Sequence, residues 1–288
     1  MISIDFVPGS HGHFLEYVCN KYIMGQQIDF DPFNSAGASH AKFQNEEYNR
    51  DKQFSALHYS IENIPRTDDV VRITVDHDDL LLLTAGTFLR AGDSNINLDH
   101  LETNTFNILS GSKYFSYLID ALNNSYPNLN LSATNPNCPR HILREFFKFG
   151  FVQPEQNGLI LEFNKLTYPT GVKCFDFPYK NFYNKQLFHR SIKQLAQWVG
   201  KESTLTLCED TIWDTFYSKQ IFRNYKTECD RIINCINAKR FTNIPNLGLL
   251  QESYINGMLE KQYNIEMPFV QPEYFTNTAH IIKHLCLR

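Results

Sequence analysis

A short stretch near the N-terminus, "PGSHGHF", carries the residue types that bind and move anionic groups. Gly9 and Gly12 lack side chains, so the backbone there can approach a phosphate closely. Ser10 offers a hydroxyl donor, and His11 and His13 offer ring nitrogens that act as acid or base near neutral pH. If a helix starts here, its first amides and its dipole also favour an anion. The stretch predicts an anion-binding loop; the alternative is a plain strand-to-helix turn with two surface histidines.

The loop departs from the phosphate-loop signature GxxxxGK[ST] of nucleotide-binding proteins. Phe14 stands five residues after Gly9, where that signature has its second glycine, and the loop contains no lysine. The spacing alone therefore does not identify a nucleotide-binding protein. Other residues must decide whether a nucleotide binds here.

A second group of candidate residues follows the apolar stretch "VVRITVD", which ends at Asp76. An aspartate at the end of a buried strand is typical of the magnesium-holding strand in phosphate-loop enzymes. Because neighbouring strand ends meet in parallel sheets, Asp76 and His77 could join His11 or His13 in a metal site. The alternative is structural: Asp76 caps a helix and His77 is exposed to solvent.

Hydrophobic periodicity predicts the elements that must position these residues. From the N-terminus we expect a strand (2–7), a helix (14–25), a polar lid-like loop (29–43), a strand (70–76), a helix (78–92), a mostly helical segment (105–150) and one or two strands (157–184). A helix (185–200), one long helix or two (210–239) and a last helix (244–269) follow. Strands that alternate with helices predict a three-layer α/β/α fold with a mostly parallel sheet. We expect residues 1–288 to form a single domain.

Composition and charge argue against several classes of partner. The chain of 288 residues has a formal net charge of −4, so it lacks a bulk positive field for nucleic acid. Its seven cysteines form no CxxC pair, which favours reduced thiols in a cytosol. No signal-peptide pattern opens the sequence, and the longest apolar run, "LLLL" at 80–83, is too short to span a bilayer. We therefore expect a soluble cytoplasmic protein without a nucleic-acid or membrane partner.

Three stretches of the first 200 residues resemble landmarks of the sulfotransferase family. "FVPGSHGHFLEYV" resembles the family's sulfate-donor loop. "VVRITVDHDDLLLLT" is similar to a strand followed eight residues later by a phosphate-binding serine, since Thr84 lies eight residues after Asp76. "VKCFDFPYKNFYNKQLFHRSIKQLAQWVG" is similar to a strand, an aromatic link and a helix that ends in "FLG". The whole chain resembles divergent sulfotransferase-like proteins encoded by marine phages and bacteria.

The resemblance implies a phosphate-loop nucleotide-binding fold of the sulfotransferase type, with residues 201–288 as a helical part packed on it. It implies transfer of a sulfuryl group from 3′-phosphoadenosine 5′-phosphosulfate to a hydroxyl acceptor, such as a glycan, without a metal. His11 or His13 would stabilise the developing charge or take the acceptor's proton. The residues expected to contact the donor are Gly9, Ser10, His11, Gly12, His13, Phe14, Thr84 and a recruited arginine from among Arg90, Arg140 and Arg144.

The sequence departs from the family's pattern in two places, the loop and the end of the apolar stretch "VVRITVD". His11 and His13 stand where the family's loop carries a lysine or arginine, and Asp76 stands where an arginine contacts the 3′-phosphate. Each lost charge-assisted contact is worth roughly 1.5–3 kcal/mol. The three arginines just named and Lys148 are candidates to replace those contacts; alternatively they form a solvated basic face.

Two other functions stay open. A magnesium-dependent phosphotransferase or nucleotide hydrolase would use Asp76, and a non-catalytic protein of the same fold would bind a nucleotide or a glycan. The aromatic run "FDFPYKNFY" (175–183) lines an acceptor groove in one interpretation and forms core and turn in the other.

Overall fold

The structure is a computed structural model, and its chain divides into two compact units. Unit 1 comprises residues 1–79 and 161–221, and unit 2 comprises residues 80–160 and 222–288. Each unit is described by itself, and the expectation of a single domain stays a prediction. The residues that the structure describes are 1–7, 9–28, 51–58, 68–83, 147–148, 151–153, 158–159, 166–207, 211–218, 220, 223–238 and 249–263.

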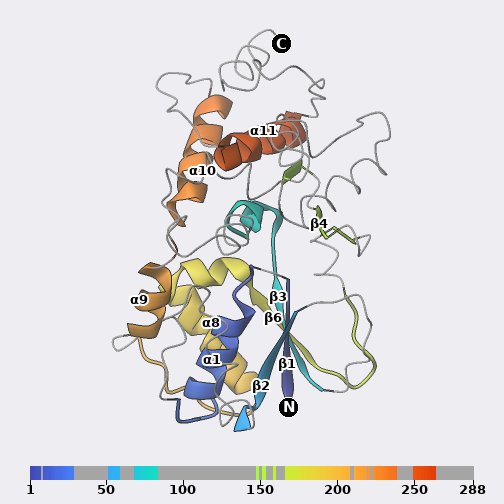
Figure 1. Ribbon diagram of the computed structural model, residues 1–288, viewed down its shortest axis with the longest axis vertical. Helices are drawn as coiled ribbons and strands as arrows, with labels where there is room; N and C mark the ends of the chain where they lie inside the picture. The colour runs from blue at the N-terminus through green and yellow to red at the C-terminus, as the bar shows by residue number, and fades with distance from the viewer. Residues whose placement is uncertain are drawn as a thin grey trace, which may run out of the picture. The chain divides into compact units, whose positions relative to one another are not determined.

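Unit 1 is built on a parallel sheet. Its strands are β1 (Ile2–Phe6), β2 (Phe54–His58), β3 (Val70–Thr74) and β6 (Cys174–Pro178). They lie in the order β2-β1-β3-β6, and every pairing is parallel (Figure 1). Because the strands run in one direction, their carboxyl ends all lie at one edge of the sheet. This parallel sheet with its helices confirms the α/β class; the three-layer arrangement stays a prediction.

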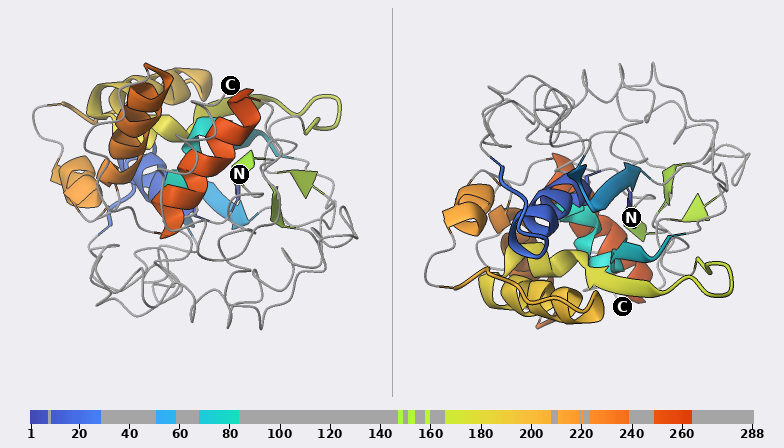
Figure 2. Two further views of the ribbon diagram at one scale, coloured as in Figure 1. Left: turned by 90° about the horizontal axis from the view of Figure 1, so that it is seen from above. Right: turned by 90° about the horizontal axis from the view of Figure 1, so that it is seen from below.

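An α-helix or a 3₁₀ helix follows each of β1, β3 and β6. The helices and 3₁₀ helices of unit 1 are α1 (Gly12–Tyr22), η2 (His77–Asp79), η5 (Tyr179–Tyr183), α8 (Lys185–Trp198) and α9 (Thr211–Ser218). α1 contacts β1 and β2, and α8 contacts β6, on the same side of the sheet (Figures 1 and 2).

The two faces of the sheet differ in polarity because strand side chains alternate. Ile4, Val71 and Phe177 are fully buried on one face. On the other face Asp5, Arg72 and Asp176 are in register across three strands. There Arg72 Nε donates to Asp176 Oδ1 at 2.7 Å, and Tyr168 donates its hydroxyl to Asp5 at 3.3 Å.

Several helices and strands differ in their bounds from those predicted from the sequence. α1 begins at Gly12 rather than at Phe14, and β3 ends at Thr74, so Asp76 belongs to the loop after it. The segment expected as one helix from residue 78 opens with η2 and is helical at 80–83. β2 has no counterpart among the expected strands. The predicted lid at 29–43 lies outside the described residues.

In unit 2 the described elements are β4 (Phe151–Gln153), β5 (Gly158–Leu159), α10 (Arg223–Asn237) and α11 (Leu249–Tyr263). β4 and β5 pair antiparallel, and α10 packs on α11. The segment 210–239, expected as one long helix or two, contains two helices among its described residues, α9 in unit 1 and α10 here. Most of the segment at 105–150 lies outside the described residues.

Candidate functional site

The candidate site lies at the carboxyl edge of the parallel sheet. β1 has β2 on one side and β3 on the other, so the strand order reverses at β1. In open α/β sheets such a switch point, outside the carboxyl ends of the strands, is the usual place of a ligand. The segments that follow β1, β3 and β6 here are the Gly9–His11 loop, the Asp76–Asp79 segment and η5. The predicted loop therefore lies where the fold favours a binding site.

The backbone of the loop folds back on β1. Gly9 has a φ of 86°, a left-handed conformation that glycine adopts without strain. The Ser10 amide and the Ser10 hydroxyl both donate to the carbonyl of Val7, at 3.1 and 2.7 Å. Ser10 is fully buried. Its hydroxyl proton is therefore used within the loop, and the predicted donation from Ser10 to a phosphate would require that bond to break.

Gly12 has a packing reason to be a glycine. It is the first residue of α1, and a Cβ built on it would overlap the ring of Phe6. Phe6 is itself buried in β1. The second glycine of the loop therefore brings α1 close to β1, whether or not it also brings the backbone close to an anion.

His11 is held among aromatic rings. Its backbone precedes α1 with a φ of 64°, uncommon for a residue with a side chain, and its side chain does not cap the helix. The ring stacks on Tyr179 at 5.4 Å and 11°, and its Nε2 lies 2.9 Å from the Tyr183 hydroxyl. Phe182 and Phe216 meet it edge-on at 5.3 and 4.9 Å. We call these five residues, from the loop, η5 and α9, the aromatic box.

The aromatic box also contains a chain of hydrogen bonds. The hydroxyl of Tyr183 lies 2.8 Å from the hydroxyl of Tyr179 in addition to its contact with His11. His11 is 4% exposed and Tyr179 is fully buried, whereas Tyr183 is partly exposed. Tyr183 is therefore the member of the chain nearest to solvent. Sequence reasoning placed 175–183 in a groove or in the core, and the burial of Phe177, Tyr179 and Phe182 fits the core interpretation.

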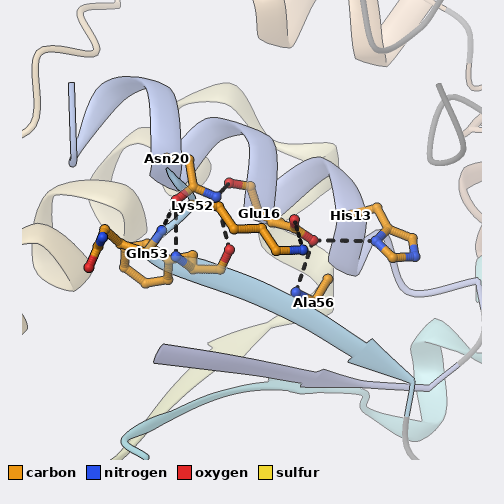
Figure 3. Close-up of polar contacts among 7 residues, drawn as sticks. His13, Glu16, Asn20, Lys52, Gln53 and Ala56 are labelled. Atoms are coloured by element: carbon orange, nitrogen blue, oxygen red, sulfur yellow. Dashed lines mark hydrogen bonds and ion pairs between the residues drawn. The ribbon is translucent and has the colours of Figure 1, made fainter. Parts of the chain in front are cut away.

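His13 points to a different set of partners (Figure 3). Its Nδ1 lies 3.5 Å from Glu16 Oε2, one turn along α1, and its ring meets the edge of Phe6. Glu16 has no exposed surface, lies 3.4 Å from Lys52 Nζ, and accepts a hydrogen bond from the Ala56 amide at 2.9 Å. His13 is thus tied to a buried carboxylate between α1 and β2.

Asn20 extends these contacts one turn further along α1 (Figure 3). Its Oδ1 accepts from the amides of Gln53 and Phe54, both at 2.9 Å, and its Nδ2 donates to the Phe54 carbonyl and to the Glu16 carbonyl. We call His13, Glu16, Asn20 and Lys52 with these backbone groups the Glu16 network. Sequence reasoning missed it, although polar residues four apart inside an apolar helix were a signal.

Asp76 has a cationic partner. Its Oδ2 lies 3.0 Å from Nζ of Lys180, the second residue of η5, and both side chains are more than half exposed. The hydrogen bond from Lys180 to Asp76 and the charge of Asp76 raise the pKa of the lysine. Lys180 was not among the expected site residues. It follows β6 and so lies at the same edge of the sheet as the loop, which contains no lysine or arginine.

The other expected ligands fall into two groups, and the possible metal site is a separate question. Thr84, Arg90, Arg140 and Arg144 lie outside the described residues. Lys148, in unit 2, lies 3.7 Å from Glu260. In the part of the chain that the structure describes, no three histidine, cysteine, aspartate or glutamate side chains are grouped so that they could hold a metal ion. The predicted joining of Asp76 and His77 with a loop histidine is therefore not seen.

The fold and the site define an α/β protein with a candidate ligand site at the carboxyl edge of a parallel sheet. No model of a known protein family, no curated protein and no solved structure matches the chain. Among the described residues, no helix combines the length and the apolar character needed to cross a bilayer.

Proposed function

We propose that this protein binds a phosphate-bearing nucleotide at the carboxyl edge of its sheet and transfers a sulfuryl group from 3′-phosphoadenosine 5′-phosphosulfate to a hydroxyl acceptor. One observation carries the proposal. The loop that resembles a sulfate-donor loop follows β1, the strand at which the strand order reverses. The phosphate-loop fold of the sulfotransferase type is part of the same proposal.

The start of α1 supports binding of an anion. The first amides of an α-helix have no acceptors within the helix, and the helix dipole favours negative charge beside them. The side chain of His11, which precedes α1, does not cap these amides. The resemblance implies that the amides of Gly9 to His13 would hold the 5′-phosphosulfate, and two of these residues, Gly12 and His13, open α1.

The Asp76–Lys180 pair changes the expected electrostatics of the edge. Asp76 alone would repel a phosphate, which was the main objection to a nucleotide. The 3.0 Å contact with Lys180 gives the pair a net charge near zero. A phosphate arriving at this edge would compete with Asp76 for the lysine. Lys180 would then supply one charge-assisted contact that the loop histidines do not.

The experiment is titration calorimetry with adenosine 3′,5′-bisphosphate. We expect the wild-type chain to bind it, and Lys180→Glu to bind it roughly tenfold or more weakly, because a charge-assisted contact is worth roughly 1.5–3 kcal/mol. Lys193→Glu makes the same charge change on an exposed position of α8 and should leave the affinity unchanged. Absence of binding by the wild-type chain would overturn the donor assignment.

A magnesium-dependent phosphotransferase or hydrolase is the second candidate. Asp76 favours it, because its half-exposed carboxylate follows the strand next to β1. This function predicts nucleotide affinity that requires magnesium and is lost in Asp76→Asn. Binding without either reaction would identify the third possibility, a non-catalytic protein of the same fold.

A further inference from the structure

We infer that Tyr183 is the residue that takes the proton of the acceptor hydroxyl, and that His11 receives the proton of Tyr183 in turn. The inference rests on the proposed function for its substrate, and on the aromatic box for its geometry. The resemblance pointed to a loop histidine as the base, whereas the structure pairs buried His11 with a tyrosine that is more exposed than the histidine itself.

The direction of the hydrogen bonds follows from what each group can donate. A neutral imidazole has one donating and one accepting nitrogen, and a phenol can donate one proton while it accepts another. If Nε2 of His11 accepts, Tyr183 donates to it at 2.9 Å and must accept from Tyr179 at 2.8 Å. Tyr179 then donates toward Tyr183, and Tyr183 donates toward His11.

The surroundings of His11 favour that neutral ring. His11 is 4% exposed, and its described ring neighbours are phenyl and phenol groups from η5 and α9. A buried charge is costly, and the positive end of the α1 dipole lies beside this residue. A stacked Tyr179 ring eases a transient imidazolium, since aromatic faces attract cations. His11 therefore starts neutral and can carry a proton during the reaction.

The proton balance of the transfer is simple. The acceptor oxygen forms a bond to sulfur while the bond from sulfur to the nucleotide's phosphate oxygen breaks. The hydroxyl proton of the acceptor passes to the oxygen of Tyr183, and the phenol proton passes to Nε2 of His11. The products are the sulfate ester, adenosine 3′,5′-bisphosphate and a protonated His11, which returns its proton through Tyr183 to water. In these terms Tyr183 is catalytic, and His11 and Tyr179 are positioning residues.

Nitrogen-15 spectra of the histidine rings test the geometry without any substrate. The His11 signals are assigned by their loss in His11→Phe. We expect a neutral ring with the proton on Nδ1, and a shift of the Nε2 signal in Tyr183→Phe. Tyr217→Phe is the matched control, because Tyr217 lies on α9 with its ring stacked on Trp213 rather than on His11. A neutral ring with the proton on Nε2, or an Nε2 signal unchanged in Tyr183→Phe, would overturn the inference.

Turnover tests the role in the reaction. General acid–base catalysis typically contributes about 100- to 10,000-fold, so we expect kcat to fall by about 100-fold or more in Tyr183→Phe. The affinity for adenosine 3′,5′-bisphosphate should stay within about twofold, and Tyr179→Phe should lower kcat less. An active wild-type enzyme whose kcat survives Tyr183→Phe would refute the catalytic role. If the wild-type chain binds no bisphosphate, the proposed function fails, and the nitrogen spectra still decide the proton chain.

Discussion

His11 and His13 belong to one loop motif but lead to opposite kinds of surroundings. His11 enters the aromatic box, whose partners are neutral rings more than 160 residues away in the sequence. His13 enters the Glu16 network, whose partners are a carboxylate and an ammonium group within 40 residues. His11 precedes α1 with a left-handed backbone whereas His13 lies inside the helix, so two residues of one motif need not share a role.

The two groups of contacts differ in their access to solvent. The Glu16 network joins α1 to β2 and is closed around a fully buried carboxylate. The aromatic box joins the loop to η5 and includes Tyr183, which is partly exposed. We therefore interpret the network as a structural link and the box as part of the site. This division predicts that substitutions in the Glu16 network cost more stability than substitutions in the aromatic box.

Glu16→Ala should cause the largest loss of stability. It leaves Lys52, a mostly buried cation, without its carboxylate, and leaves the Ala56 amide without its acceptor. Removal of one partner of a buried ion pair costs about 3–5 kcal/mol. Urea denaturation followed by circular dichroism measures the free energy of unfolding. Glu16→Gln keeps an oxygen for the Ala56 amide and should lose clearly less. A loss under about 1 kcal/mol in Glu16→Ala would show that the network does not hold β2.

Gly12→Ala should cost less, about 1–3 kcal/mol, because an added methyl group in a packed core forces its neighbours to move. The neighbour here is the ring of Phe6. The double variant Gly12→Ala/Phe6→Leu gives that methyl group more room. Double-mutant analysis by urea denaturation should therefore show favourable coupling between the two substitutions. Strictly additive losses would mean that the glycine serves the loop and not the contact between α1 and β1.

The elements that these two variants test also show how much of the fold could be predicted from the sequence. β1, β3, α1 and α8 are visible in it because their apolar periodicity is local. β2 is not, since "FSALH" is short and its first residues are held by the Asn20 side chain, more than 30 residues earlier. The pairing of that strand is a tertiary event, and local patterns do not encode it.

The candidate site shows even more clearly that local sequence patterns do not encode tertiary contacts. The loop and the strand before it were predictable from glycine, histidine and a short apolar run. Tyr183 and Lys180 were not, because they reach the edge of the sheet that carries the loop only when η5 follows β6 there. The sequence offered an aromatic run there, and nothing in its spacing separates Tyr183 from the buried Phe182. Long-range strand order, rather than residue type, brings these residues to the candidate site.

The pH dependence of stability tests the buried thiol of Cys19, which lies three residues after Glu16 on α1. Burial, and next the negative charge of Glu16, raise the pKa of this thiol well above its ordinary value. The unfolded chain therefore loses the thiol proton at a lower pH than the folded chain does. Above about pH 8.5, the ordinary pKa of a thiol, the free energy of unfolding should fall as pH rises, by up to about 1.4 kcal/mol per pH unit from this group.

Cys19→Ala isolates that contribution. Urea denaturation at pH 8, 9 and 10 should give a decline less steep in Cys19→Ala than in the wild type, whatever the constant cost of the smaller side chain. Equal slopes would mean that the thiol is not held neutral beside Glu16. The aromatic box has no buried thiol of this kind among its members, so His11→Phe should leave the wild-type slope in place.

The smallest effect on stability is expected at His11, the residue that acts through Tyr183. His11→Phe keeps a ring of similar size in the aromatic box and removes one hydrogen bond, to a tyrosine that is partly exposed and can bond to water instead. We expect a loss of stability of about 1 kcal/mol or less, well below that of Glu16→Ala, while sulfuryl transfer falls strongly. Urea denaturation and turnover on the same preparation measure both. If His11→Phe instead destabilises the chain as much as Glu16→Ala, the two histidines are structural alike, and the division between network and site is wrong.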